Sequence, residues 1–210
     1  AHCLVRCKAL NYSVNTRTLD NVKEVLLNIE QHMTADYYSV ETKRAIRAYA
    51  CYVLALSGDE KASQKAYSLY TSAKIENFSL ESLGWISYAF AATGNKKYTK
   101  EINEIVKYLM NRCHTTADRA NFISSYEDQS ASKLVMLHSD TRTDAVILES
   151  LITIDSKNKI IPMIVKGLLG RRKQGKWGST QENVQVLLAL NTYFKVFEKD
   201  DPNFIMQTWY

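Results

Sequence analysis

The chain has 210 residues, of which 46% are hydrophobic, and a formal net charge of +5. This length is enough for one sizeable hydrophobic core, and no apolar run approaches the ~20 residues that a membrane-spanning helix needs. Seven glycines and two prolines give few turn signals, so the composition disfavours an all-β fold and favours helices with short connections.

Positive charge is concentrated in one place, Arg171-Arg172-Lys173 with Lys176 close by. A cluster this short is typical of a helix end, where cations interact well with the free carbonyls and the helix dipole. No recognised nucleic-acid motif or stacking aromatic residue accompanies it. We therefore expect no nucleic-acid partner and no membrane span.

Hydrophobic residues recur at intervals of three and four along most of the chain, which indicates amphipathic or buried helices. Serines precede several of these segments and glycines follow two of them, as expected of helix caps. The predicted helices are Leu4–Leu10, Thr18 or Asp20 to Met33, Ser39–Gly58, one after Asp59, Ser79–Gly94, Tyr98–Cys113, Thr141 or Thr143 to Ile154, one with Pro162 in its first turn, and one beginning at Ser179.

Two internal repeats relate these helices. Residues 52–61 align with residues 88–97 at a shift of 36, and residues 146–155 align with residues 184–193 at a shift of 38. Repeats of this length, in which a buried helix alternates with an amphipathic one, are typical of stacked helix pairs. The sequence thus predicts an all-α fold built from antiparallel helix pairs.

One segment, residues 119–140, breaks the helical periodicity. Phe122, Ser124 and Tyr126 alternate along the chain, and so do Leu134, Met136 and His138, with the polar link Glu127–Ser130 between the two sets. Alternation with a period of two across a polar link predicts a short β-hairpin or an extended excursion.

A glycine-bounded turn, Gly175–Gly178, runs directly into the last predicted helix. Ser179 and Glu182 have the spacing of a capping box, in which the hydroxyl and the carboxylate each accept a backbone N–H of the first turn. We expect Trp177 to lay its ring over this first turn, because the flanking glycines allow a close approach of the backbone. A well-capped core helix is preferred here over a ligand site.

Metal and catalytic sites are not indicated. Zinc ligation by His2, Cys3, Cys7, Cys113 and His114 is conceivable. The four cysteines, which include Cys51, form no CxxC pair, so buried apolar cysteines are the preferred interpretation. His138 with Asp140 could form an oriented base, yet no nucleophile stands out beside it. We expect no metal, no cofactor and no catalytic residue in this chain.

The remaining candidate charges are interpreted as structural. Asp144 suits the positive end of a helix, and Arg142 can pair with it or with Glu149. Glu81 and Glu182 are assigned, like Glu149, to caps or salt bridges rather than to acid catalysis.

Four segments resemble the bacterial alpha-2-macroglobulins in order and sequence: Thr141–Leu151, Ile161-Pro162, Gly175–Asn183 and Asp201–Phe204. The match is to the C-terminal portion of their thioester-domain region. It implies an α/α toroid over residues 1–200 that lacks its N-terminal part, and an extended tail, 201–210, leading to a macroglobulin-like β domain. The residues of the resembling motifs are Arg142, Thr143, Asp144, Gly175, Trp177, Gly178, Ser179, Thr180, Gln181 and Glu182.

The resemblance implies a structural and interaction domain of a broad-spectrum protease trap, periplasmic or secreted, whose partners are target proteases and adjacent β domains. The Cys-x-x-Gln motif of the family's thioester is absent after each of the four cysteines. The chain begins at Ala1 without a leader, which we interpret as a fragment. The alternative is a toroid enzyme of the terpene-cyclase, prenyltransferase or polysaccharide-lyase type, although no aspartate-rich run is present.

Overall fold

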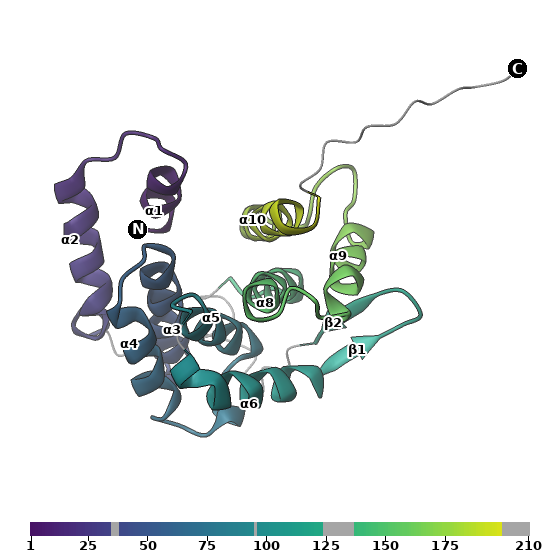
Figure 1. The fold of residues 1–210 in the computed structure, drawn as a ribbon, viewed down its shortest axis with the longest axis horizontal. Helices are drawn as coiled ribbons and strands as arrows, with labels where there is room; N and C mark the ends of the chain where they lie inside the picture. The colour runs from purple at the N-terminus through teal and green to yellow at the C-terminus, as the bar shows by residue number, and fades with distance from the viewer. Residues whose placement is uncertain (35–37, 95, 124–136, 199–210) are drawn as a thin grey trace, which may run out of the picture.

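The helices alternate between an inner and an outer layer of a curved arch (Figure 1). The computed structural model describes residues 1–34, 38–94, 96–123 and 137–198. The inner helices are α1 (His2–Ala9), α3 (Val40–Leu56), α5 (Leu80–Ala91), α8 (Asp140–Ile154) and α10 (Thr180–Phe197). The outer helices are α2 (Thr16–Leu27), α4 (Lys61–Tyr70), α6 (Thr99–Met110) and α9 (Ile160–Gly170).

Neighbouring inner helices pack against one another, α3 on α5, α5 on α8 and α8 on α10. Outer helices cover this row, with α4 on both α3 and α5, α6 on α5, and α9 on α8. Short 3-10 turns complete three connections: η1 (Ile29–His32), η2 (Ile75–Asn77) and η3 (Lys96–Tyr98). This is the arrangement of part of an α/α toroid, so the predicted all-α class is confirmed.

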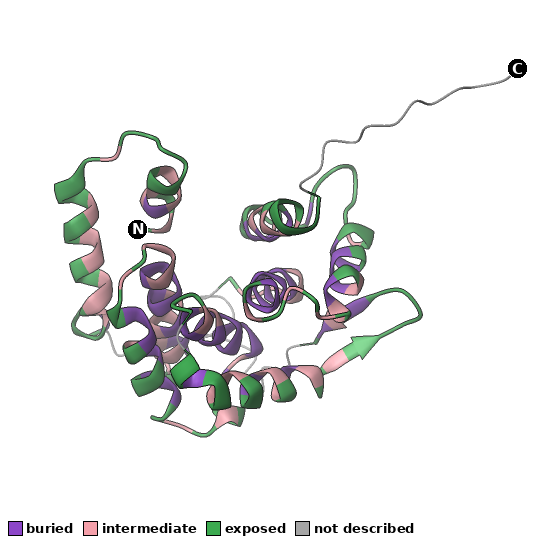
Figure 2. Ribbon diagram, in the orientation of Figure 1, coloured by how far each residue is buried: buried purple, intermediate pink, exposed green. Residues whose placement is uncertain are grey.

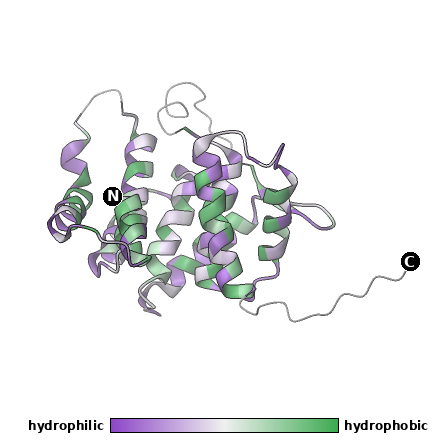
Figure 3. Ribbon diagram, turned by 90° about the horizontal axis from the view of Figure 1, so that it is seen from above, coloured by the Kyte–Doolittle hydropathy of each residue, from purple (hydrophilic) through white to green (hydrophobic). Residues whose placement is uncertain are grey.

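The core lies in the inner row (Figure 2). Helices α5 and α8 are buried around most of their circumference, whereas α2 has no buried residue and lies at the edge. Fully burying a large apolar side chain such as Phe90 or Ile147 stabilises the fold by roughly 1.5–3 kcal/mol. Figure 3 shows that hydrophilic and hydrophobic residues share the same helices.

The ends of the helices agree with the sequence signals. Ser39 and Ser79 accept the N–H of the residue three positions on, and so cap α3 and α5. Gly58 and Gly94, equivalent in the repeat of 36, both adopt a left-handed backbone, with φ of 73° and 65°. Glycine adopts this conformation at no steric cost, which explains why both helix pairs turn at this residue type.

A short antiparallel hairpin joins α6 to the rest of the chain. It consists of β1 (Cys113–Thr115) and β2 (Ala120–Phe122), with Cys113 opposite Phe122. A hairpin is therefore present near the predicted one, but its first strand begins before residue 119 and its turn lies at 116–119 instead of at the predicted link, 127–130. The predicted alternation over residues 124–136 lies outside the described residues.

The predicted tail, 201–210, also lies outside the described residues. Within the described ranges, no helix is both long enough and apolar enough to cross a bilayer.

Candidate functional site

The most concentrated polar network lies on the inner face, where α1, α3, α8 and α10 meet. Glu149 is 2% exposed, and its carboxylate accepts hydrogen bonds from Arg6 at 2.7 Å and from the Tyr52 hydroxyl at 2.6 Å. The Thr192 hydroxyl lies 3.3 Å from the same carboxylate, and Arg6 also donates to the Tyr52 oxygen at 2.9 Å. Four helices are thus joined through one buried carboxylate.

Aromatic side chains surround this network. The His2 ring contacts the Tyr49 hydroxyl at 2.9 Å and accepts from Arg6 Nε at 3.1 Å. Burial and the neighbouring Arg6 charge lower the pKa of His2 to about 4. Burial raises the pKa of Tyr88 to about 12 and raises the pKa of Tyr52 further. His2 is therefore neutral, and both tyrosines keep their protons, at physiological pH.

A second ion pair joins α5 to α8. Arg142 donates two hydrogen bonds to Glu81, from Nε at 2.6 Å and from a terminal nitrogen at 2.7 Å. Both side chains are at least nine-tenths buried. The predicted pairing of Arg142 with Asp144 or Glu149 is wrong, because these carboxylates have other partners and Glu81 approaches from the neighbouring helix.

The Asp144 carboxylate is fully buried and fastens the hairpin and the end of α9 to α8. It accepts the Phe122 backbone N–H at 2.7 Å and pairs with Arg171 at 2.7 Å. Burial raises the pKa of Asp144 to about 7, although the Phe122 N–H and the Arg171 charge both act to lower it. Arg171, a member of the basic cluster seen in the sequence, therefore makes a specific ion pair with Asp144.

The predicted capping box at the start of α10 is confirmed. Ser179 Oγ accepts the Glu182 N–H at 3.2 Å, and the Glu182 carboxylate accepts the Ser179 N–H at 3.2 Å. Ser139, the N-cap of α8, donates to the same carboxylate. The cap therefore joins the first turns of two inner helices, next to the exposed Thr180 and Gln181.

Trp177 is 5% exposed and belongs to the hydrophobic core. Its indole N–H donates to the Leu168 carbonyl of α9 at 2.8 Å, so the ring packs back on the preceding helix. Asn183 fixes the backbone of Trp177 by accepting its N–H and donating to its carbonyl. Gly175, with φ of 83°, provides the turn, and a Cβ at Gly178 would lie 2.9 Å from Glu182.

The motif residues are therefore gathered at one end of α8, α9 and α10, where they act as caps and fasteners. Thr143 belongs to the same group, since its buried hydroxyl donates to the Ser139 carbonyl at 3.1 Å. The expectation that Glu81, Glu149 and Glu182 serve caps and salt bridges is confirmed.

Cysteine and histidine side chains form no metal centre in the described part of the chain. The four cysteines are free thiols, and only Cys51 is buried, so the interpretation of all four as buried residues is wrong. Cys3 and Cys7 face each other at 4.0 Å on the short helix α1. His138 Nε2 lies 3.5 Å from Asp140, as its spacing allowed.

Sequence reasoning missed Arg6, Tyr52 and Thr192 as partners of Glu149. A signal existed, because Glu149 lies in the almost wholly apolar stretch 145–152 and a buried carboxylate needs a cation or several donors. The partner itself was not predictable, since Arg6 is 143 residues away in the chain.

Comparison with known proteins gives one informative similarity. No family model matches the chain. The chain is 29% identical over 147 residues to a protein of Dictyostelium discoideum named "Circularly permutated Ras protein 2", a match that covers 70% of this chain and 4% of that protein. The chain thus spans a small fraction of the length of the relative it matches.

This finding corrects the assignment to the bacterial alpha-2-macroglobulins. The matched protein carries a Ras name and not that of a macroglobulin, a protease inhibitor or a toroid enzyme, so both predicted functions are overturned. The periplasmic or secreted location stays a prediction. The physical reason is visible in the structure. The motifs that suggested the family are helix caps and a glycine turn, features that helix-pair folds of any function require.

The Ras name of the matched protein makes a nucleotide-binding site a candidate to consider in this chain. Residues 170–176 have the glycine and lysine spacing of a phosphate-binding loop, but Trp177 follows where such a loop has Ser or Thr. The segment also leaves the helix α9 and closes through a bridge between Lys173 and Lys176, whereas a phosphate-binding loop follows a β-strand. This segment therefore lacks both the hydroxyl and the setting that the chemistry needs.

Proposed function

We propose that this chain is a non-catalytic scaffold domain. Its role is to hold adjacent parts of a longer protein in a fixed geometry on a curved arch of helix pairs. The observation that carries the proposal is the use of the buried charges: Arg6 with Glu149, Arg142 with Glu81 and Arg171 with Asp144.

Each of these pairs links segments that are distant in sequence. A catalytic acid or base must face a substrate, whereas Glu81, Asp144 and Glu149 face helices of the same chain and are each at most 2% exposed. The Arg142–Glu81 pair resists rearrangement most strongly, because both side chains are buried and breaking the pair leaves an uncompensated charge in the interior. The arrangement therefore supports rigidity rather than turnover.

The similarity to a much longer protein is consistent with a domain that works alongside others. Because the match covers 4% of that protein, its name describes a molecule in which most residues lie outside the similar region. The partners proposed for this chain are accordingly the neighbouring domains of its own longer polypeptide.

A GTPase activity is the competing function, and nucleotide binding tests it. A ligand present at 100 times its Kd stabilises a protein by about 2.7 kcal/mol, which raises the Tm of a chain this size by roughly 5–10 °C. We expect no change in Tm with GTP or GDP in the presence of Mg²⁺, and no phosphate release. A saturable rise in Tm with either nucleotide would contradict the scaffold proposal.

A further inference from the structure

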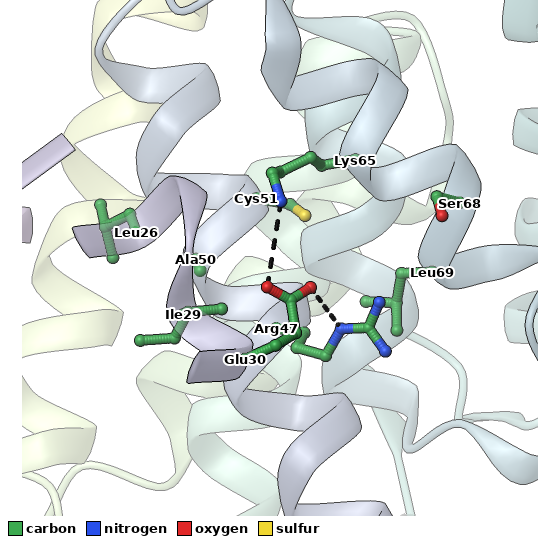
Figure 4. A pocket seen from close by; sticks show the side chains of 9 residues that line it. All are labelled: Leu26, Ile29, Glu30, Arg47, Ala50, Cys51, Lys65, Ser68 and Leu69. Atoms are coloured by element: carbon green, nitrogen blue, oxygen red, sulfur yellow. Dashed lines mark ion pairs between the residues drawn. The ribbon is translucent and has the colours of Figure 1, made fainter. Parts of the chain in front are cut away.

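A small pocket lies between α3, α4 and the 3-10 turn η1, away from the charged network of the inner face (Figure 4). Its volume is about 40 Å³. A space of this size accommodates roughly three water molecules, which is comparable with the oxygen atoms of a small oxyanion. Leu26, Ile29 and Leu69 form its apolar wall.

Three charged side chains from three elements face this pocket. Arg47 Nε of α3 lies 3.0 Å from one oxygen of Glu30, and Lys65 Nζ of α4 lies 3.9 Å from the other. Figure 4 shows the Glu30 carboxylate between the two cations. The pocket thus carries two positive charges and one negative charge.

Neither ion pair with Glu30 is a well-oriented hydrogen bond. Although Arg47 Nε lies within ion-pairing distance, it is buried and has no hydrogen-bond partner among the described residues. The Lys65 contact is near the limit of an ion pair, and the Glu30 side chain is 44% exposed on a single 3-10 turn. Ion pairs whose carboxylate is this exposed contribute little to stability, so Glu30 can be displaced at small cost.

The uncharged part of the pocket lining is also compatible with an anion. Cys51 lines it, and burial raises the pKa of this thiol to about 12, so the sulfur stays neutral and does not repel negative charge. Arg47 and Lys65 act to lower this pKa and Glu30 acts to raise it, consistent with all three lining the pocket beside Cys51.

We propose that this pocket binds a divalent tetrahedral oxyanion of the phosphate class, held by Arg47 and Lys65 while Glu30 moves towards solvent. Two cations match a charge of −2, whereas Glu30 neutralises only one of them. The anion offers an acceptor to the Arg47 Nε–H, a buried donor that is costly to leave unpaired. The Glu30 carboxylate then competes with the anion for Arg47 and Lys65, and so lowers the affinity of the pocket for the anion. The proposal is independent of the scaffold role.

Calorimetric titration with inorganic phosphate at constant ionic strength tests the proposal. Removing the competing negative charge in Glu30→Gln should tighten binding about tenfold, and Arg47→Met should weaken it by at least as much. Lys65→Met provides a second loss-of-binding variant on another helix. Arg17→Met removes an exposed cation of α2 outside the pocket and should leave binding unchanged.

Glycerol phosphate, titrated in parallel, distinguishes a free ion from the phosphate group of a larger molecule. Binding of either ligand that responds to Glu30→Gln and Arg47→Met in opposite directions supports the site. The proposal is overturned if neither the wild type nor Glu30→Gln shows saturable binding below about 10 mM, or if the Arg47→Met and Lys65→Met chains, with unchanged helical circular dichroism, bind like the wild type.

Discussion

At the scale of single residues, Glu149 joins its own helix to three other helices of the inner face. Its two carboxylate oxygens receive Arg6, Tyr52 and Thr192 from three different helices. Each buried hydrogen bond adds only a little net stability. Removing its acceptor costs more, because the donor is then left unpaired in the interior. Glu149 is therefore expected to be a stability determinant.

Replacing Glu149 with alanine should lower the free energy of unfolding by about 3 kcal/mol, because the buried Tyr52 hydroxyl and the Arg6 charge lose their acceptor. Urea denaturation measures this change. Glu24→Ala, at an exposed position on α2, is the control and should change stability by no more than about 0.5 kcal/mol. Equal effects of the two substitutions would show that the network does not stabilise the fold.

His2 makes stability depend on pH with a definite sign. Its folded pKa of about 4 is lower than its ordinary value of 6.5, so the unfolded chain binds the proton more readily. The contribution of His2 is present above pH 6.5 and is lost as the pH falls towards 4. Between pH 7.5 and 4.5 the wild type should lose about 2–3 kcal/mol more than His2→Gln does.

The same substitution at the exposed His32 provides the control for this pH dependence. His32→Gln should follow the wild-type pH curve in urea denaturation. If His2→Gln follows it too, the imidazole of His2 is not held in its neutral form by the fold.

At the scale of elements, helix α9 and strand β2 approach each other at a glycine. A Cβ on Gly167 would lie 2.5 Å from the carbonyl oxygen of Ala120, a backbone atom that cannot move freely. A Cβ on Gly170 would instead meet the guanidinium of Arg119, the far end of a flexible side chain. The two glycines of one helix thus face very different constraints.

We expect Gly167→Ala to destabilise the chain by about 2–3 kcal/mol through overpacking, despite the better helix propensity of alanine. Gly170→Ala should change stability by no more than about 1 kcal/mol in either direction. Thermal unfolding of the two variants compares them directly. A Gly167→Ala chain as stable as Gly170→Ala would mean that β2 does not pack against α9 in this way.

The capping box of α10 makes a separate prediction. Ser179→Ala removes the acceptor of the Glu182 N–H and should cost about 1 kcal/mol. Ser68→Ala, at an exposed interior position of α4, should be neutral or slightly stabilising because alanine is the better helix former. Chemical denaturation of both variants decides whether the effect comes from the cap or from serine itself.

The sequence predicted interactions between residues close together in the chain, but not those between residues far apart. Helix starts at Ser39, Ser79 and Ser179 were predicted, because a cap involves residues three positions apart. The partner of Arg142 was not, because Glu81 lies 61 residues earlier and its approach depends on how α5 packs against α8. The acceptor of the Trp177 indole N–H was not predicted either, since it belongs to the preceding helix.

At the scale of the whole molecule, the inner row is a set of helices that touch in sequence order and are joined by buried charges. The repeats predicted helix pairs, and the Arg142–Glu81 pair joins two neighbouring inner helices, α5 and α8. Residues that serve a substrate are commonly not optimal for stability, so replacing them tends to stabilise a protein. Replacing residues that serve only the scaffold should instead destabilise the protein.

A double-mutant cycle on Arg142 and Glu81 tests this account most directly. Measured by urea denaturation, Arg142→Met and Glu81→Leu should each cost about 3–5 kcal/mol, because each leaves the other charge buried and uncompensated. The double variant should cost at least about 2 kcal/mol less than the sum of the two. If either single variant is as stable as the wild type, or if the two costs simply add, this buried pair does not hold the arch together.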